Sequence, residues 1–528
     1  MRTDYDETPY PSLSYGQTHP DRMATIATLL GLHPVPVTHC RVLELGSAAG
    51  GNIYPLAYAL PDSQFVGVDI SQAQVDEGHR LISRLGLQNI ALHKMDIMDI
   101  TPEFGQFDYI IAHGVYSWVP APVREKLMQI CKQNLSPNGI AYISYNSYPG
   151  WHMMGAIREA MLYRTRNTQD PLERVTQARA LLDFMAESLS AENSVFGAFL
   201  QSYMHFLKGE LKGANALGNA FLLHDELEEV NDPIYFSQFI AQAATHGLQY
   251  VAEADFADVF PKGFSEQTMA TLQTLAHDIV EMEQYLDFLR SKMFRQTLLC
   301  HAENTVQRTL SLNRAIGLYA SSRLRPESQT PSIETISVEK FLSGSDEVTL
   351  STDHPVSKAA LIYLAEVWPR AIRISDLLNI AREKVNAPPE RIEEDAQDLL
   401  ANMLKAYTYS SQLVELHAFQ PRVVTEPGER PLASPVARLG AEGGLIATNM
   451  WHERAHLTPF LRQLLQLLDG ARDREALLDK LTELAVAEVL HLKLDGQPVT
   501  DPVVIRPLLE RELEPNLQWL GRAGTLVG

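Results

Sequence analysis

The sequence predicts an α/β fold, with a doubly wound sheet in the first part of the chain and mainly helical units after it. Two observations support this fold. Between residues 21 and 151, strand-like apolar runs alternate with helical patterns, as in sheets whose parallel strands are joined by crossover helices. From residue 151 to about residue 222 the strand-like runs are absent, and two more follow before residue 302.

The expected elements of the sheet follow one another in a regular order. An amphipathic helix at 21–33 precedes the strands, which we expect at 41–45, 63–69, 90–97, 107–114, 140–151, 248–254 and 293–302. Helices at 72–85, 123–134 and 233–247 lie between strands. The last two strands return after the strand-free stretch, so they complete the same sheet.

The chain of 528 residues divides into five expected regions. They are the first part of the sheet at 1–150, a helical insertion at 151–222, the completion of the sheet at 223–305, a winged-helix-like unit at 306–424 and a C-terminal helical or winged-helix-like unit at 436–528. The insertion is too long for a structureless loop, so we expect it to fold as a cap or an interface.

Composition disfavours several classes of protein. The formal net charge is −21, which repels nucleic acid and anionic membranes. No run approaches the ~18 apolar residues of a membrane span, and the N-terminus has no signal-peptide core, so we expect a cytoplasmic protein. The three cysteines, Cys40, Cys131 and Cys300, lie far apart, and no His/Asp/Glu cluster has zinc spacing, so we expect no metal.

The winged-helix-like order of 356–417 raises the question of DNA binding. Residues 351–417 carry seven Lys or Arg and ten Asp or Glu. The third helix, where base-reading side chains would lie, holds Glu393, Glu394, Asp395 and Asp398. This face repels phosphate, so we predict no nucleic-acid partner and assign the unit to protein interaction or substrate presentation.

The loop after the first strand is the most informative stretch. Gly46 allows a tight turn, Ser47 and Ala48 let a ligand approach the backbone closely, and Gly50 leads into a helix with Asn52 near its start. Neither the G-x-G-x-x-G pattern of nicotinamide folds nor the G-K-[ST] of a Walker loop is present. The loop therefore suits a nucleoside with a neutral or cationic tail better than a di- or triphosphate.

Acidic residues stand at the ends of three successive strands: Glu44, Asp69 and Asp96. The carboxyl ends of such strands meet in the crevice where open α/β sheets bind ligands. Asp69 has the position and the spacing of an acid that binds ribose hydroxyls. Asp96 can accept from an adenine amino group, with Ile70 and Ile97 flanking the ring. For each acid taken singly, a helix cap or a solvated strand end is the alternative.

The stretches "VLELGSAAGG", "FVGVDIS" and "KMDI" resemble, in order and spacing, the class I S-adenosylmethionine-dependent methyltransferases. One departure is Ala48, where the family has a second glycine. The resemblance implies a Rossmann-like seven-stranded sheet, with "FRQTLLCHA" as its antiparallel closing strand, S-adenosyl-L-methionine as cofactor and S-adenosyl-L-homocysteine as product.

A narrower resemblance covers most of the chain. The stretches "PYPSLSYGQTHPDRMA", "HGVYSWVP", "SYNSYPGWHMMGAIREA", "LLHDELEEVNDPIYFSQF" and "QYLDFLRSKMFRQTLLCH" are similar to bacterial methyltransferases with a methyltransferase regulatory domain. That group includes protein-lysine methyltransferases. It implies a protein substrate, a homodimer formed through the insertion and winged-helix-like C-terminal domains.

Methyl transfer is an in-line displacement that needs alignment, a dry pocket and a free lone pair. Tyr116, Trp118 and Tyr145 follow adjacent strands and can hold an amine or sulfonium by cation–π contact, or else pack in the core. Asn146 can orient the nucleophile. His113 can contact the cofactor or accept a proton. We also expect Gly114 to face the cofactor and Tyr15, in the N-terminal segment, to belong to a lid over it or to an ordinary N-terminal arm.

The sequence therefore predicts a methyltransferase (EC 2.1.1 class) acting on a protein lysine amine. Two alternatives stay open: a small-molecule N- or O-methyltransferase with the insertion as its lid, and a cofactor-binding regulatory or scaffold protein without turnover. A transcription factor is disfavoured by the acidic third helix of 356–417.

Overall fold

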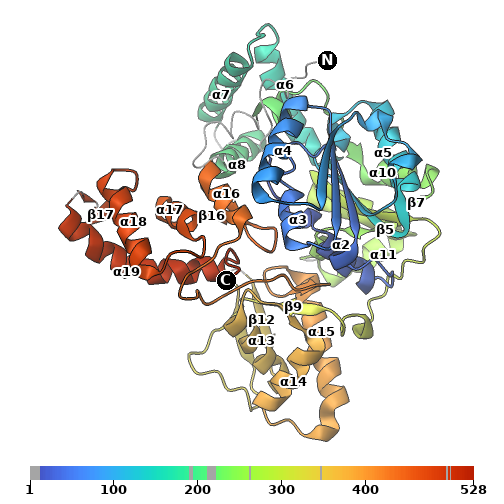
Figure 1. The fold of residues 1–528 in the computed structure, drawn as a ribbon. Helices are drawn as coiled ribbons and strands as arrows, with labels where there is room; N and C mark the ends of the chain where they lie inside the picture. The colour runs from blue at the N-terminus through green and yellow to red at the C-terminus, as the bar shows by residue number, and fades with distance from the viewer. Residues whose placement is uncertain are drawn as a thin grey trace.

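The structure of the protein is a computed structural model, which describes residues 12–189, 194–210, 222–260, 263–344, 348–494, 497–499 and 501–528. The sheet and its helices occupy one side of the molecule, the helical insertion stands above it, and two further units lie below and beside it (Figure 1). No helix within these ranges is long and apolar enough to cross a membrane.

Seven of the eight strands that form the sheet in the described residues follow the order β3-β2-β1-β4-β5-β8-β7. They are β1 (Arg41–Leu45), β2 (Gln64–Asp69), β3 (Ile90–Lys94), β4 (Phe107–Ala112), β5 (Leu135–Tyr148), β7 (Leu248–Glu253) and β8 (Phe294–His301). β8 runs antiparallel to both of its neighbours. A two-residue strand, β6 (Ile234–Tyr235), pairs with the end of β5. The predicted fold class and its antiparallel closing strand are therefore confirmed.

Strand alternation divides the core into two layers. Tyr109 and Tyr142 belong to a cluster that includes residues of α2 (Pro20–Leu29), α3 (Tyr54–Ala59) and α4 (Gln72–Leu85). Ile110 and Tyr145 belong to a second cluster, with α5 (Ala121–Gln133) and α10 (Phe236–Thr245). Because successive side chains of a strand point to opposite faces, this division also decides which residues can meet at the edge of the sheet.

The insertion has a small core of its own. Its helices are α6 (Trp151–Thr165), α7 (Pro171–Ser188) and α8 (Val195–Glu210), followed by the π-helical turn η6 (Leu222–Glu226). Met154, Ile157, Met161 and Leu182 are among the buried residues of this core. Helices α11 (Glu266–Leu275) and α12 (Ile279–Arg290) then lie between β7 and β8. The helical insertion of the predicted fold is thus present.

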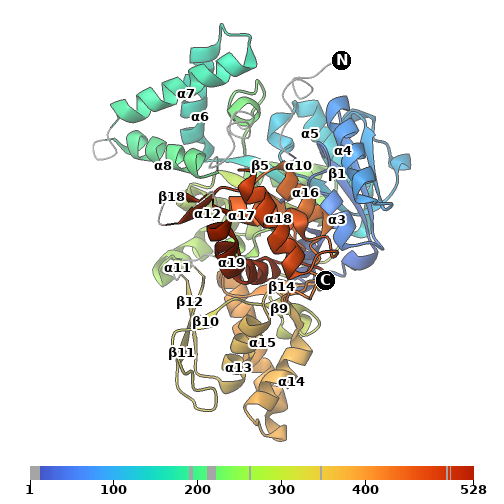
Figure 2. The same cartoon turned by 60° about the vertical axis from the view of Figure 1, so that its left-hand side comes forward.

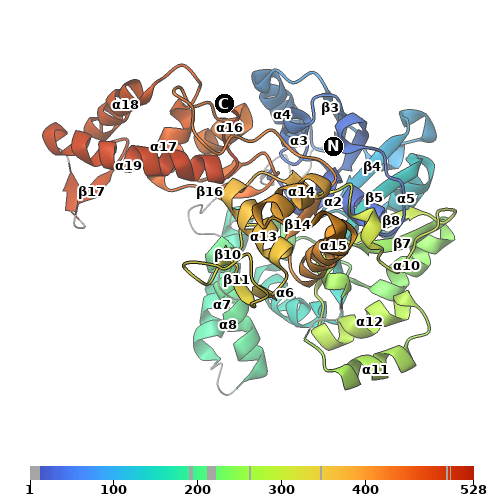
Figure 3. The same ribbon diagram turned by 90° about the horizontal axis from the view of Figure 1, so that it is seen from below.

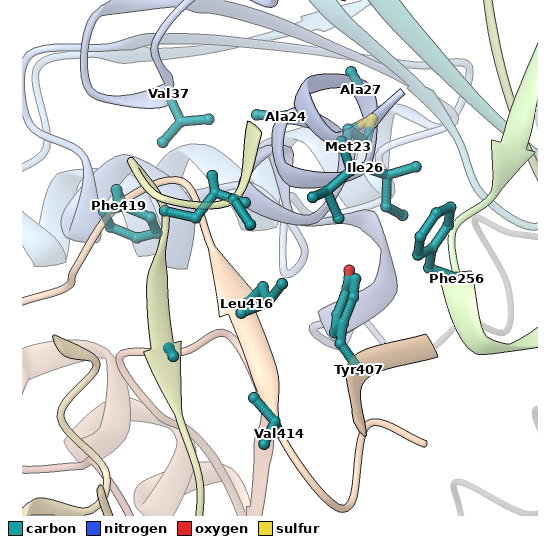
Figure 4. Packing of buried hydrophobic residues seen from close by; sticks show 14 of the residues in the cluster. Met23, Ala24, Ile26, Ala27, Val37, Phe256, Tyr407, Val414, Leu416 and Phe419 are labelled. Carbon is teal, nitrogen blue, oxygen red and sulfur yellow. The ribbon is translucent and has the colours of Figure 1, made fainter. Parts of the chain in front are cut away.

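The next unit packs directly on the sheet domain. Its elements are β9 (Tyr319–Ser321), β10 (Arg325–Pro326), β11 (Glu339–Leu342), β12 (Thr349–Thr352), α13 (Pro355–Val367), β13 (Ile372–Arg373), α14 (Ile374–Lys384), α15 (Ile392–Tyr409) and β14 (Glu415–His417). Met23 and Ile26 of α2 share one buried cluster with Tyr407 and Leu416 of this unit (Figure 4). The unit is therefore continuous with the core beneath the sheet.

The C-terminal unit has a separate core. It consists of α16 (Pro435–Gly443), the hairpin β15 (Ile446–Thr448) and β16 (Arg454–His456), α17 (Pro459–Leu467), α18 (Arg474–Val486), the hairpin β17 (Leu492–Leu494) and β18 (Gln497–Val499), and α19 (Pro502–Arg522). Helix α16 lies beside the sheet domain, while α18 and α19 lie farther out (Figures 1 and 3).

Candidate active site

The loop between β1 and α3 is built by residues with left-handed backbone. Gly46 has φ +72° and Gly50 has φ +77°. A Cβ atom on Gly46 would lie 2.7 Å from Cγ2 of Val115, so only glycine fits there. Ala48 also has a positive φ, +47°, which explains why related loops carry glycine at this place.

Asp69 ties this loop to the end of β2. Its Oδ2 accepts a hydrogen bond from the Ala48 N–H at 2.8 Å, and its Oδ1 accepts one from the Ser71 N–H at 2.9 Å. These two bonds hold the loop that follows β1 and the residue that precedes α4 against the end of β2.

Glu44 is buried at the end of β1. Its Oε1 accepts from Nδ2 of Asn52 at 2.7 Å, whereas its Oε2 is buried and has no hydrogen-bond partner among the residues that the structure describes. Burial raises the pKa of Glu44 to about 8; the charge of Asp69 also raises it, and the hydrogen bond from Asn52 lowers it. The Oγ of Ser47 is likewise buried without a partner. Such groups cost free energy unless a ligand satisfies them.

The N-terminal segment runs along the loop. The Oγ of Ser12 accepts from the Gly51 N–H at 2.7 Å, and the Tyr15 N–H donates to Oδ1 of Asn52 at 2.9 Å. A Cβ atom on Gly51 would lie 2.3 Å from the Ser12 carbonyl oxygen, so the loop and the segment need a glycine to pack this closely. The Tyr15 ring lies 4.1 Å from the ring of His113. These two predicted site residues therefore meet.

His113 leaves the end of β4 on the same face as Tyr142. Its Nδ1 lies 3.0 Å from the Tyr142 hydroxyl and 3.2 Å from the Ser144 Oγ, which also accepts from the Gly114 N–H. Burial, with a smaller contribution from Arg454, lowers the pKa of His113 to about 3. His113 is therefore neutral near pH 7 and a weaker base than the sequence led us to expect.

The residues expected around an adenine ring lie along the edge next to β2 and β3. Asp96 caps the turn η3 (Ile97–Asp99), and its Oδ1 accepts from the Met98 N–H at 2.9 Å. Ile97 is partly buried and packs against the second core cluster. Ile70 remains 46% exposed, so its side chain offers an apolar surface at this edge.

Tyr116 and Tyr145 lie in the core of the sheet domain. Both rings are buried in the second cluster, where Tyr145 stacks on Phe239 at 4.1 Å. The Tyr116 hydroxyl donates to Oε1 of Gln242, and the Tyr145 hydroxyl lies 3.0 Å from Oγ1 of Thr297. Of the two roles that the sequence left open for these rings, cation–π contact and packing in the core, the structure has the second, and alternation along β5 directs Tyr145 to the face opposite Tyr142.

Trp118 and Asn146 stay near the carboxyl edge. Trp118 is half-buried in the turn η5 (Tyr116–Trp118). The Asn146 N–H donates to Oγ of Ser117 at 2.8 Å, and its Nδ2 donates to Oδ1 of Asn231 at 3.3 Å. The adjacent ends of β4 and β5 therefore hold both residues, as their order in the sequence predicted.

Three family models match the chain. A "Methyltransferase domain" matches residues 36–189, a "Predicted methyltransferase regulatory domain" residues 218–301 and a "PKMT, C-terminal winged helix domain" residues 429–524. "Uncharacterized protein RP789" of Rickettsia prowazekii is 34% identical over 520 residues, which cover 97% of this chain and 92% of that protein. The chain belongs to the methyltransferases that carry a methyltransferase regulatory domain. It is an S-adenosylmethionine-dependent enzyme.

Two solved structures extend this relationship to the fold. PKMT2 from Rickettsia typhi is 27% identical, with a TM-score of 0.86, and covers 98% of this chain and 100% of its own. The same protein in complex with AdoHcy gives 28% identity and a TM-score of 0.84, with the same coverage. The methyltransferase thus shares its whole architecture with a protein whose structure holds the demethylated cofactor.

The methyltransferase also has a cavity that the sequence did not indicate. It measures about 230 Å³ and is lined by Glu253, Asp255, Asp258, Lys292, Phe294 and Gln296. The Phe294 ring lies 6.3 Å from the His113 ring, edge to face. Because β8 is antiparallel, its first residues lie at the carboxyl edge of the sheet, next to the candidate site. The sequence contained one signal for this side of the cavity, because the predicted closing strand is antiparallel and its first residues must lie at the carboxyl edge.

Proposed function

We propose that this methyltransferase transfers a methyl group from S-adenosylmethionine to a lysine amine of a protein. The cofactor supplies the methyl group on a sulfonium carbon. The observation that carries the proposal is the acidic cavity beside His113, since carboxylates attract a cationic amine. Its volume of about 230 Å³ is below the ~300 Å³ at which most small-molecule sites begin. A narrow aliphatic side chain therefore suits it better than a ring.

We assign the cofactor to the carboxyl edge of β1, β2 and β3. Glu44 and Ser47 fit it because each has a buried polar atom that no other described residue satisfies. Asp69 and Asp96 would accept from the ribose hydroxyls and the adenine amino group, with Ile70 and Ile97 beside the ring. Gly46, Ala48, Gly50 and Gly114 let the backbone approach, while Asn52 orients Glu44. Tyr15 and His113 would close the site over the reacting carbon.

The residues of the acceptor side have separate tasks in this proposal. Phe294 and His113 form a wall that excludes water, so that the lone pair of the amine meets the methyl carbon in line. Asp255 and Asp258 draw the ammonium form into the cavity, and Lys292 pairs with Asp258 at 2.5 Å. The ammonium group must lose its proton to water before attack, because only the neutral amine has a free lone pair. Trp118 and Asn146 stand at the neighbouring strand ends and limit the direction of approach.

The test is methylation of candidate proteins followed by mass spectrometry. We expect added methyl groups on lysine in mixtures with the wild-type enzyme and S-adenosylmethionine, and none with Asp69→Ala. Asp258→Asn should lower the rate several-fold, while Asp62→Asn, an exposed acid far from the cavity, should not. If free amines or phenols are methylated while all proteins stay unmodified, the acceptor is a small molecule and not a protein lysine.

We propose that the five regions named above act as domains, and that 151–222 joins two copies of the chain. The insertion exposes Tyr163, Leu172, Phe184 and Val195, large apolar side chains that a second copy would cover. We also place the enzyme in the cytoplasm, because Cys40, Cys131 and Cys300 are free and buried.

A further inference from the structure

The C-terminal unit reaches into the candidate cofactor site. The turn between β15 and β16 contacts the loop that follows β1 through His452 and Asn52. Helix α16 lies beside α3 in views from the front and from below (Figures 1 and 3). Figure 2 shows the same unit in front of the sheet domain. Its residues 448–454 contact residues 14–19 and 52, about 400 positions earlier in the chain.

His452 makes the central contact. Its Nε2 lies 2.8 Å from Oδ1 of Asn52, and both side chains are buried. The same amide donates from Nδ2 to Oε1 of Glu44 at 2.7 Å. One asparagine therefore connects an imidazole of the C-terminal unit with the carboxylate at the end of β1.

The hairpin also fastens the N-terminal segment. Nε of Arg454 donates to the Ser14 carbonyl oxygen at 2.7 Å, and the guanidinium lies 4.5 Å above the Tyr15 ring. Oγ1 of Thr448 lies 3.0 Å from Oγ of Ser14. Tyr15 in turn donates its N–H to the same Oδ1 of Asn52. The segment is thus held between the hairpin and the loop.

The turn is arranged to aim His452 inward. His452 has φ +64°, a left-handed conformation that costs free energy in a residue other than glycine. Oδ1 of Asn449 accepts from the N–H groups of Trp451 and Glu453 at 2.9 and 2.8 Å, which holds the turn in this form. The Trp451 indole donates to the Pro369 carbonyl oxygen at 2.9 Å and anchors the turn on the preceding unit.

The imidazole is a neutral donor in this environment. Burial lowers the pKa of His452 well below its ordinary value, and the nearby His19 and Arg454 lower it further. Within the described part of the chain Nδ1 of His452 has no hydrogen-bond partner, so the proton belongs on Nε2, which donates to Asn52.

We propose that His452 is a positioning residue of the cofactor site, supplied by the C-terminal domain. Through Asn52 it holds the Glu44 carboxylate and the N-terminal segment in the geometry that receives S-adenosylmethionine. The C-terminal domain is then part of the cofactor site, and the domain must be docked for tight binding. The inference rests on the cofactor residues assigned under the proposed function and does not depend on the acceptor.

Calorimetry with S-adenosylhomocysteine on the full chain tests this role, because it needs no acceptor. His452→Ala and the similarly sized His452→Met both lose the donor, and we expect each to bind about tenfold more weakly, the effect of about 1.4 kcal/mol. His452→Gln restores a donor and should recover most of the affinity. His456→Ala, an exposed histidine of the same hairpin, is the matched control and should bind as the wild type does.

A double-mutant cycle with Asn52→Ala separates positioning from simple packing. Because the effect runs through Asn52, adding His452→Met to Asn52→Ala should cost little more. Wild-type affinity in His452→Met, or losses that add fully, would overturn the inference. If Asp69→Ala binds normally, the proposed cofactor site itself is wrong, which is a different result from a failure at His452 alone.

Discussion

Ala48 holds a left-handed backbone conformation, φ +47°, while its N–H donates to Oδ2 of Asp69 at 2.8 Å. The hydrogen bond keeps the loop in place although this conformation is unfavourable for an alanine. Left-handed backbone costs a residue with a Cβ atom about 1–2 kcal/mol. The loop therefore stores strain beside the candidate cofactor site.

We predict that Ala48→Gly raises the free energy of unfolding by up to about 1.6 kcal/mol. Relief of the strain, about 1–2 kcal/mol, exceeds the about 0.4–1 kcal/mol that glycine gains in unfolded-state entropy. Urea denaturation gives the difference. Ala49→Gly is the control, because Ala49 lacks a positive φ and its replacement should only destabilise. An equal loss in both variants would contradict the prediction.

The affinity for S-adenosylhomocysteine should rise with pH in the wild-type enzyme. Burial raises the pKa of Glu44 to about 8, so the free enzyme holds a proton there below that pH. A ligand that brings an ammonium group favours the carboxylate and displaces the proton. Calorimetry between pH 6 and pH 8.5 should show tighter binding up to about pH 8 and then a plateau. Glu44→Gln should remove this dependence.

The raised pKa of Glu44 also affects the stability of the ligand-free protein. The folded state keeps the Glu44 proton up to about pH 8, whereas the unfolded state loses it near the ordinary value of 4.5. The folded state binds more protons in this window, so this group's contribution to the free energy of unfolding falls as pH rises from 4.5 to 8. The fall should be shallower in Glu44→Gln than in the wild type, and identical slopes would contradict it.

Arg295→Met should destabilise the sheet domain by about 3–5 kcal/mol. Arg295 is buried and pairs with Glu253, Glu283 and Asp287 at 2.9, 3.0 and 2.7 Å, so its removal leaves three buried acids uncompensated. Denaturation with guanidinium chloride measures the loss. Arg506 also faces three acids but lies at the surface, where screening weakens such pairs, so Arg506→Met should have a much smaller effect.

Trp118→Ala should lower turnover more than affinity for the cofactor. The ring is half-buried beside the ends of β4 and β5, where we place the acceptor, and it is outside the loop that follows β1. Initial rates of methyl transfer to a substrate protein measure turnover, and calorimetry measures affinity for the cofactor. Trp519→Ala, on the outer helix α19, is the control. If cofactor affinity falls while turnover is unchanged, Trp118 has a structural role and not a role at the acceptor.

Phe184→Glu should shift the protein toward the monomer. Phe184 is exposed on α7, and a charge there opposes burial against a second copy. Sedimentation velocity measures the change, and Phe288→Glu, an exposed phenylalanine outside the insertion, should not produce it. If the wild-type protein is a monomer at micromolar concentration, the proposed dimer is wrong.

Much of the sheet was predictable because its signals are local. The strand at 41–45 and the helix at 72–85 have the predicted bounds, since apolar runs, a cap and a terminal glycine define them within a few residues. The fifth strand begins earlier than expected, at Leu135, because Leu135 pairs with Phe107 of β4 and an irregularity in the register spans the turn-like stretch before Ile140 pairs with Tyr109. Pairing of this kind depends on residues distant in the sequence.

The sequence by itself predicted the fold class and the positions of the acids at the strand ends, because alternating strand and helix patterns are local signals, while the resemblance to class I methyltransferases implied the cofactor. Only the tertiary structure decided which side chains meet there. Tyr145 turned to the core and Phe294 to the edge, since a strand sends alternate side chains to opposite faces. His452 reached Asn52 from about 400 residues away, a contact made by domain packing that no local pattern encodes.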